Sequence, residues 1–155
     1  MMLSMLGDMV VSRSETSGAQ TLRRTMEESS GLASAPVRQT LSTCTVDVEM
    51  WPSTVVVSVV GELDMADADQ VGKILIDAVD ADRPIVRLEL AGLTFADSSA
   101  IKAILIGAQA AQEHGVTYEL VNPHDRVRRL LEVTGLANVL TLVDEAAYQE
   151  GPNSL

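Results

Sequence analysis

The stretch VVVSVVGELD at residues 55–64 decides the fold of this protein. Five valines in six positions are typical of a strand buried on both faces of a sheet, because such a strand has no solvent-facing side that needs polar residues. The turn Gly61-Glu62-Leu63-Asp64 then leaves the strand. A buried strand with a polar turn at its carboxyl end predicts an α/β fold whose sheet is largely parallel at its centre.

The residues after this turn have the pattern of a helix. Asp64 can cap the helix and Asp67 lies in its first turn, where an acidic side chain is favoured. The pattern predicts that the helix ends near Asp80. Its apolar stripe, which would pack on the sheet, consists of Ala68, Val71, Ile74, Leu75 and Ala78.

The same alternation of strands and helices continues on both sides of this unit. An edge strand is predicted around Val46 and Val48, and three more strands at residues 86–90, 116–121 and 140–143. Residues 92–96 are predicted to be a connecting loop. Further helices are expected from Asp97 or Ser98 to Gly115, from an Asn122-Pro123 cap to Gly135, and over residues 144–149. The prediction is an α/β mixed sheet of about five strands covered by about four helices.

The composition indicates a single folded domain. The chain has 155 residues, of which 46% are hydrophobic and 3% aromatic, so aliphatic side chains must form the core. We expect this domain to span residues 44–150 and residues 151–155 to fray. The net charge of −11 repels phosphate backbones and anionic lipids at long range, so we expect neither a nucleic acid nor a membrane as partner.

Residues 1–43 are predicted to form a disordered, flexible N-terminal tail. From Ser12 onward they are rich in Ser, Thr, Ala and Gly and lack periodic apolar residues, so they cannot bury enough surface to offset the entropy of ordering. The apolar residues 1–11 lack a basic leading region, which argues against a signal peptide. Cys44 is the only cysteine and cannot form an intrachain disulfide. We expect a cytoplasmic monomer.

The segment LTFADSSAI at residues 93–101 places two hydroxyl groups where a strand passes into a helix. In the structural interpretation, a serine at this place only caps the free N–H groups of the helix. In the functional interpretation, Ser98 is a phosphoacceptor: a helix start tolerates a phosphate, while the added negative charge disrupts contact with a partner. The residues by themselves leave both interpretations open.

Three motifs, in order, resemble those of STAS domains, and within them the bacterial anti-sigma factor antagonists. They are GELD at residues 61–64, FADSS at residues 95–99 and RRLLEVTGL at residues 128–136. The resemblance covers roughly residues 44–150. It implies that the unphosphorylated protein binds an anti-sigma factor that is also a serine kinase, and thereby frees a sigma factor.

The resemblance also implies a role for individual residues. The hydroxyl directly after the aspartate is the phosphoacceptor, which is Ser98 here, with Ser99 as the fallback. A partner-binding surface of Glu62, Asp64, Asp97, Ser98 and Ser99 follows from the matches to the two turn motifs. The protein itself would need no cofactor, since ATP belongs to the partner kinase, and a phosphatase would reset the switch. Family members usually have glycine where this chain has Ala100, and its methyl group is expected to narrow the approach of the partner.

Other kinds of site find little support in the residues. The acids Glu62, Asp64, Asp67 and Asp69 lack the spacing of a calcium loop, and a solvated helix start explains them better, so no metal site is assigned. Ser98 lacks the flanking glycines of a hydrolase nucleophile. We therefore expect a binding partner and kinase substrate without catalytic residues of its own.

Two other functions remain open at this point. A STAS domain can serve as a regulatory subunit of a transporter or of a lipid-trafficking complex, and the folded body would look much the same. A nucleotide-binding sensor is the third possibility, and it would require measurable binding of a purine nucleotide.

Overall fold

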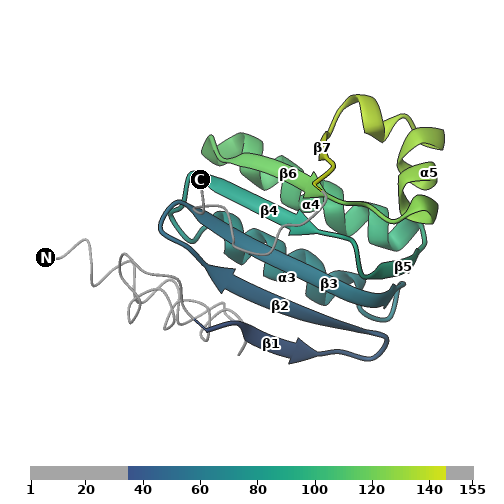
Figure 1. Cartoon of the computed structure of the whole chain (residues 1–155), viewed down its shortest axis with the longest axis horizontal. Helices are drawn as coiled ribbons and strands as arrows, with labels where there is room; N and C mark the ends of the chain where they lie inside the picture. The colour runs from purple at the N-terminus through teal and green to yellow at the C-terminus, as the bar shows by residue number, and fades with distance from the viewer. Residues whose placement is uncertain (1–34, 146–155) are drawn as a thin grey trace, which may run out of the picture.

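The computed structural model describes residues 35–145, which form one mixed sheet with helices packed on it (Figure 1). The strands are β1 (Val37–Thr40), β2 (Cys44–Met50), β3 (Thr54–Leu63), β4 (Ile85–Glu89), β5 (Leu93–Ala96), β6 (Thr117–Val121) and β7 (Thr141–Val143). The helices are α3 (Ala68–Val79), α4 (Ser98–His114), α5 (Asp125–Val133) and the single 3₁₀ turn η1 (Leu136–Asn138). The predicted α/β mixed sheet is confirmed.

The sheet has the order β1-β2-β3-β4-β6-β7, and β5 pairs with the end of β3. Strands β1, β2 and β3 are antiparallel neighbours, whereas β3–β4, β4–β6, β6–β7 and β3–β5 pair in parallel. The valine-rich strand β3 lies in the middle, as its sequence predicts, because only a central strand keeps so many valines from water.

One face of the sheet carries α3 and α4, which lie side by side (Figure 1). Gly72 of α3 lies at this contact, where a Cβ atom would be in ordinary van der Waals contact with Ile106 and Ala103 of α4. The core between the helices and the sheet includes buried side chains of β2, β3, β4, α3 and α4: Val46, Val48, Val55, Val57, Val86, Leu88, Ile74, Leu75, Ile101 and Ile104. Tight aliphatic packing of this kind needs few aromatic residues.

Two strands were missed by the sequence prediction, which expected about five. Strand β1 lies within residues 1–43, which were predicted to be a disordered tail. The predicted tail is therefore too long at its C-terminal end. β1 has only one large apolar residue, Val37, and it is held by backbone pairing with β2 and an ion pair between Arg38 and Asp47. β1, rather than the strand around Val46, is therefore the edge of the sheet. The rest of the predicted tail, residues 1–34, lies outside the described residues.

The second missed strand is β5, in residues that were predicted to be a loop. It is only four residues long, and Leu93 is its one fully buried side chain. Its partner is the last part of β3, beyond an irregularity in register at Gly61 and Glu62. No periodicity is visible in so short a segment, so tertiary pairing alone defines it.

The predicted helix limits are partly confirmed. α3 ends at Asp80 and α4 ends at the left-handed Gly115, both as expected. The N-cap of α3, however, is Asp67 rather than Asp64, and α5 begins after His124 rather than at the Asn122-Pro123 pair. Asn122 instead adopts a positive φ of 53° and accepts a hydrogen bond from the Glu145 backbone N–H. The predicted helix at residues 144–149 lies largely outside the described residues, and Asp144 and Glu145 are not helical.

Within residues 35–145, no helix is both long enough and apolar enough to span a bilayer.

Candidate docking and phosphoacceptor site

The turns that follow β3 and β5 lie next to each other. Glu62 is paired with Phe95, and Leu63 with Ala96, in parallel register. The Asp97 backbone N–H then donates to the Leu63 carbonyl at 3.4 Å. The acidic turn at Gly61–Asp64 and the start of α4 are thus adjacent, as expected for the carboxyl ends of neighbouring parallel strands.

Ser98 is the first residue of α4, and its side chain is exposed. The capping role belongs to Asp97, whose Oδ1 accepts a hydrogen bond from the Ala100 N–H at 3.0 Å. The Ser98 hydroxyl makes no hydrogen bond to any described residue and is open to solvent. Ser99 is half-buried. The structural interpretation of Ser98 as the helix cap is therefore wrong, because its neighbour fills that place.

The methyl group of Ala100 does not reach the surface. Ala100 has 0% of its surface exposed and belongs to the hydrophobic core. Ala100 is the residue of the first turn that faces the core, so its methyl group does not lie on the surface that a partner would contact, and its effect on partner binding stays a prediction.

Asp64 shapes the acidic turn rather than a helix. Its carboxylate accepts from the Ala66 N–H at 3.0 Å and faces the Thr43 hydroxyl at 3.5 Å. Its backbone carbonyl accepts from the N–H groups of Asp67 and Ala68. Glu62, two residues before Asp64, is exposed. Asp64 thus has a structural role in the turn, whereas the Glu62 side chain is available for contact with a partner.

Asp67 joins the β1–β2 turn to the start of α3. Its side chain is 3% exposed, and it accepts hydrogen bonds from three backbone N–H groups, those of Ser42, Thr43 and Cys44, and from the Thr43 hydroxyl. Burial by itself would raise the pKa of Asp67, but the bonds from Thr43, Ser42 and Cys44 outweigh it and lower this pKa to about 2. Asp67 is therefore an anion at neutral pH, and it holds Thr43 beside Asp64.

Cys44 lies against the same carboxylate. Its burial, with a smaller contribution from Asp67, raises the pKa of the thiol to about 12. A thiol that stays protonated at neutral pH is a poor nucleophile, so Cys44 has the character of a core residue.

Two large apolar side chains next to this site were missed by the sequence analysis. Phe95 is 43% exposed on β5, and Met65 is 78% exposed in the turn before α3. An aromatic residue two positions before the predicted helix start at Asp97 could have been noticed, but its exposure depends on the pairing of β5 with β3. The surface formed by Glu62, Asp64, Met65, Phe95, Asp97, Ser98 and Ser99 is called the docking face below.

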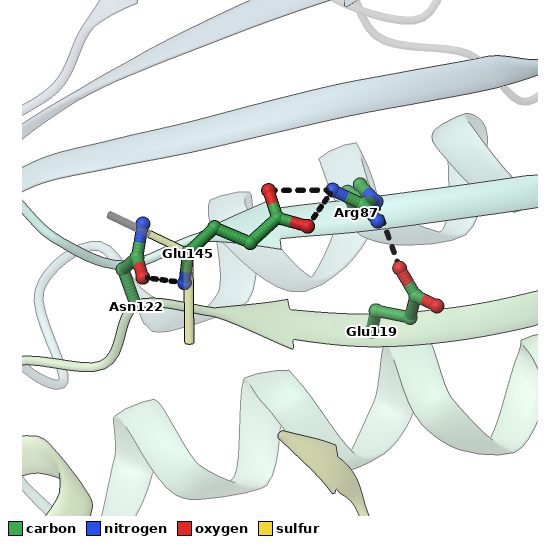
Figure 2. Close-up of polar contacts among 4 residues, drawn as sticks. All are labelled: Arg87, Glu119, Asn122 and Glu145. Atoms are coloured by element: carbon green, nitrogen blue, oxygen red, sulfur yellow. Dashed lines mark hydrogen bonds and ion pairs between the residues drawn. The ribbon is translucent and has the colours of Figure 1, made fainter. Parts of the chain in front are cut away.

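A polar cluster on β4 and β6 fixes the chain after β7 (Figure 2). Arg87 lies 2.7 Å from a Glu119 oxygen and 3.1 Å from Glu145. Figure 2 shows Glu145 extended over β4 toward Arg87, with its backbone held by Asn122. The side chains of these three charged residues are only 16–29% exposed, so the cluster stabilises the fold rather than forming an open binding site.

The described residues contain no group of three His, Cys, Asp or Glu side chains that could hold a metal ion. The arginines of α5 do not converge on a site either. Arg128 pairs with Asp144, while Arg126 and Arg129 are exposed.

Comparison with protein families finds the STAS domain, which matches residues 45–147. Among solved structures, an anti-sigma factor antagonist from Mycobacterium paratuberculosis has 25% identity and a TM-score of 0.59, covering 65% of this chain and 86% of its own. The anti-sigma factor antagonist SpoIIAA in its unphosphorylated form has 21% identity and a TM-score of 0.54, covering 72% of this chain and 89% of its own. SpoIIAA of Bacillus in its phosphorylated form has 20% identity and a TM-score of 0.51, with coverage of 72% and 92%. Comparison with curated proteins found no significant match.

Proposed function

The chain belongs to the STAS domain family, and on this premise we propose that it is an anti-sigma factor antagonist switched by phosphorylation of Ser98. In the unphosphorylated state it binds an anti-sigma factor that is also a serine kinase, and so releases a sigma factor. The observation that carries this proposal is the exposed Ser98 hydroxyl on the docking face, which makes no hydrogen bond to a described residue.

The chemistry of the switch belongs to the partner. The Ser98 oxygen attacks the γ-phosphorus of ATP held by the kinase and loses its proton to a base of that kinase. A P–O bond forms at Ser98 while the bond to the β-phosphate breaks, and ADP leaves. A phosphatase restores the hydroxyl by transferring the phosphoryl group to water. This chain therefore acts as a substrate and binding partner and contributes no cofactor.

The fold supports a phosphate at this position. Ser98 is exposed, so the added group displaces only water. Asp97 already satisfies the Ala100 N–H, and the backbone of the helix start need not rearrange. Folding should therefore survive the modification.

Partner binding should not survive it. The docking face combines the apolar side chains of Phe95 and Met65 with polar groups around Ser98, which fits a partner with an apolar pocket. A phosphoserine adds about two negative charges whose burial against the partner is costly. The resulting asymmetry between folding and binding is what a switch requires.

The proposal is tested with candidate anti-sigma kinases by calorimetry and phosphosite mapping. We expect the wild type and Ser98→Ala to bind, Ser98→Asp to bind at least about tenfold more weakly, and only the wild type and the control Ser99→Ala to be phosphorylated. Equal binding by Ser98→Ala and Ser98→Asp, or phosphate on Ser99 alone, contradicts the proposal. Capture of a permease or a lipid-transport ATPase without any kinase would favour the regulatory-subunit alternative.

A further inference from the structure

Lys102 lies one helical turn after Ser98 on α4, and both side chains are exposed. Residues four apart on a helix have Cβ atoms about 5–6 Å from each other, on the same face. An anion that precedes a lysine by four residues is also the more favourable order for an ion pair. The Lys102 ammonium is thus within reach of a group attached to Ser98.

Lys102 is the cation that helical spacing places on the same face of α4 as Ser98, while α5, which packs against β5, carries the exposed Arg126 and Arg129. Asp97 precedes Ser98 on the same chain segment, and Glu62 and Asp64 belong to the adjacent turn. On the neighbouring α3, Asp69 lies in the first turn and Lys73 one turn further on. Among residues 35–145, Lys102 forms no ion pair with a carboxylate, so its charge is available.

We propose that Lys102 binds the phosphate of phosphoserine 98 within the same helix and so stabilises the switched-off state. This inference rests on the proposed function in one respect, the choice of Ser98 as phosphoacceptor. In the unphosphorylated protein Lys102 is a solvated side chain. After phosphorylation it holds the dianion against α4, where it competes with basic groups of the partner for the same oxygens.

The test uses full-length protein with phosphoserine installed at position 98 during translation, so that no kinase is needed. The second pKa of the phosphate, ordinarily near 6, is read by ³¹P NMR titration in the wild type, Lys102→Gln and Lys73→Gln. Loss of an intrahelical pair should raise this pKa by about 0.3 pH units in Lys102→Gln, and the control should move less than half as far. Circular dichroism confirms that each variant is folded, which is expected because both lysines are exposed.

Identical titrations in the wild type and Lys102→Gln overturn the proposal, and so does an equal shift in the control. A third outcome also overturns the proposal. In it, Lys102→Gln weakens kinase binding by the unphosphorylated protein but leaves the pKa of the phosphate unchanged. Lys102 would then belong to the docking face. Because the phosphate is installed without a kinase, failure to find a kinase partner affects only the proposed function. The two proposals can therefore fail separately.

Discussion

The Asp67 carboxylate accepts a hydrogen bond from the Thr43 backbone N–H at 2.7 Å and so connects two segments that are 24 residues apart in the chain. One segment is the β1–β2 turn, which the sequence assigned to a tail, and the other is the start of α3. The connection places Thr43 against Gly61 as well, since the Thr43 carbonyl accepts from the Glu62 N–H. Asp67 therefore helps to fix the backbone at Glu62, at the edge of the docking face.

The first prediction concerns the pH dependence of stability. The pKa of Asp67 is about 2 in the folded protein and about 3.9 in an unfolded chain, so the group stabilises the fold above pH 4 and loses this effect as the pH falls toward 2. The contribution is about 2–3 kcal/mol. Urea unfolding should show that Asp67→Asn loses stability at pH 7 and becomes less dependent on pH between about 4 and 2. Asp69→Asn, on the exposed side of α3, is the control, and an equal loss there would contradict the assignment.

The second prediction concerns Gly61, where the backbone has a φ of +111°. A Cβ atom here would lie 2.8 Å from the Thr43 carbonyl oxygen, so the substitution Gly61→Ala combines backbone strain with a clash. The expected loss of unfolding free energy is about 2–4 kcal/mol. Gly115→Ala also has a positive φ but nothing within 4 Å, and it should cost only about 1 kcal/mol. Equal losses in chemical denaturation would show that the Thr43 contact has no effect.

The third prediction concerns the cluster in Figure 2. Arg87→Met leaves the partly buried carboxylates of Glu119 and Glu145 without their cation, and should lower the free energy of unfolding by about 1–3 kcal/mol. Arg38→Met removes an ion pair whose arginine is 68% exposed and should change stability by less than about 0.5 kcal/mol. Denaturant titration of both variants measures the two losses of unfolding free energy. Equal losses would show that the Arg87 cluster contributes no more than a surface ion pair.

The fourth prediction concerns the apolar part of the docking face. Phe95→Ala should weaken binding of the partner kinase by about tenfold or more, because partly exposed aromatic residues next to a phosphoacceptor are suited to be anchors of an interface. Val139→Ala is the control, since this side chain is an exposed apolar residue that shares a shallow pocket with Leu105 and Gln112 of α4 and is not part of the docking face. Calorimetric titration with the partner kinase compares the affinities of the two variants. An unchanged affinity in Phe95→Ala would show that Phe95 is not part of the interface.

The fifth prediction concerns Ala100, which has no exposed surface. Ala100→Gly should cost about 1–2 kcal/mol of stability, because it removes a buried methyl group and introduces glycine into a helix. Partner affinity should change by less than about twofold, since the substituted group is not at the interface. A gain of tenfold in affinity would show that the methyl group does obstruct the partner.

The sequence by itself determined the central features of this protein. The valine-rich run at residues 55–60 has apolar residues on both faces, which favours a central strand. The helical spacing in α3 and α4 is long enough to be recognised, and Gly115 ends α4 because its position requires a left-handed residue. The DSS sequence at residues 97–99 indicated the start of a helix that carries two hydroxyl groups.

Only the tertiary structure decided how these pieces form a surface. β1 and β5 are too short to have a period of their own, and they exist because a neighbouring strand offers unpaired backbone groups. The exposure of Phe95, the burial of Ala100 and the four hydrogen bonds that Asp67 accepts all depend on contacts between distant segments. Local sequence sets the dihedral preferences of a few residues at a time, whereas burial and long-range hydrogen bonds are properties of the whole packed chain.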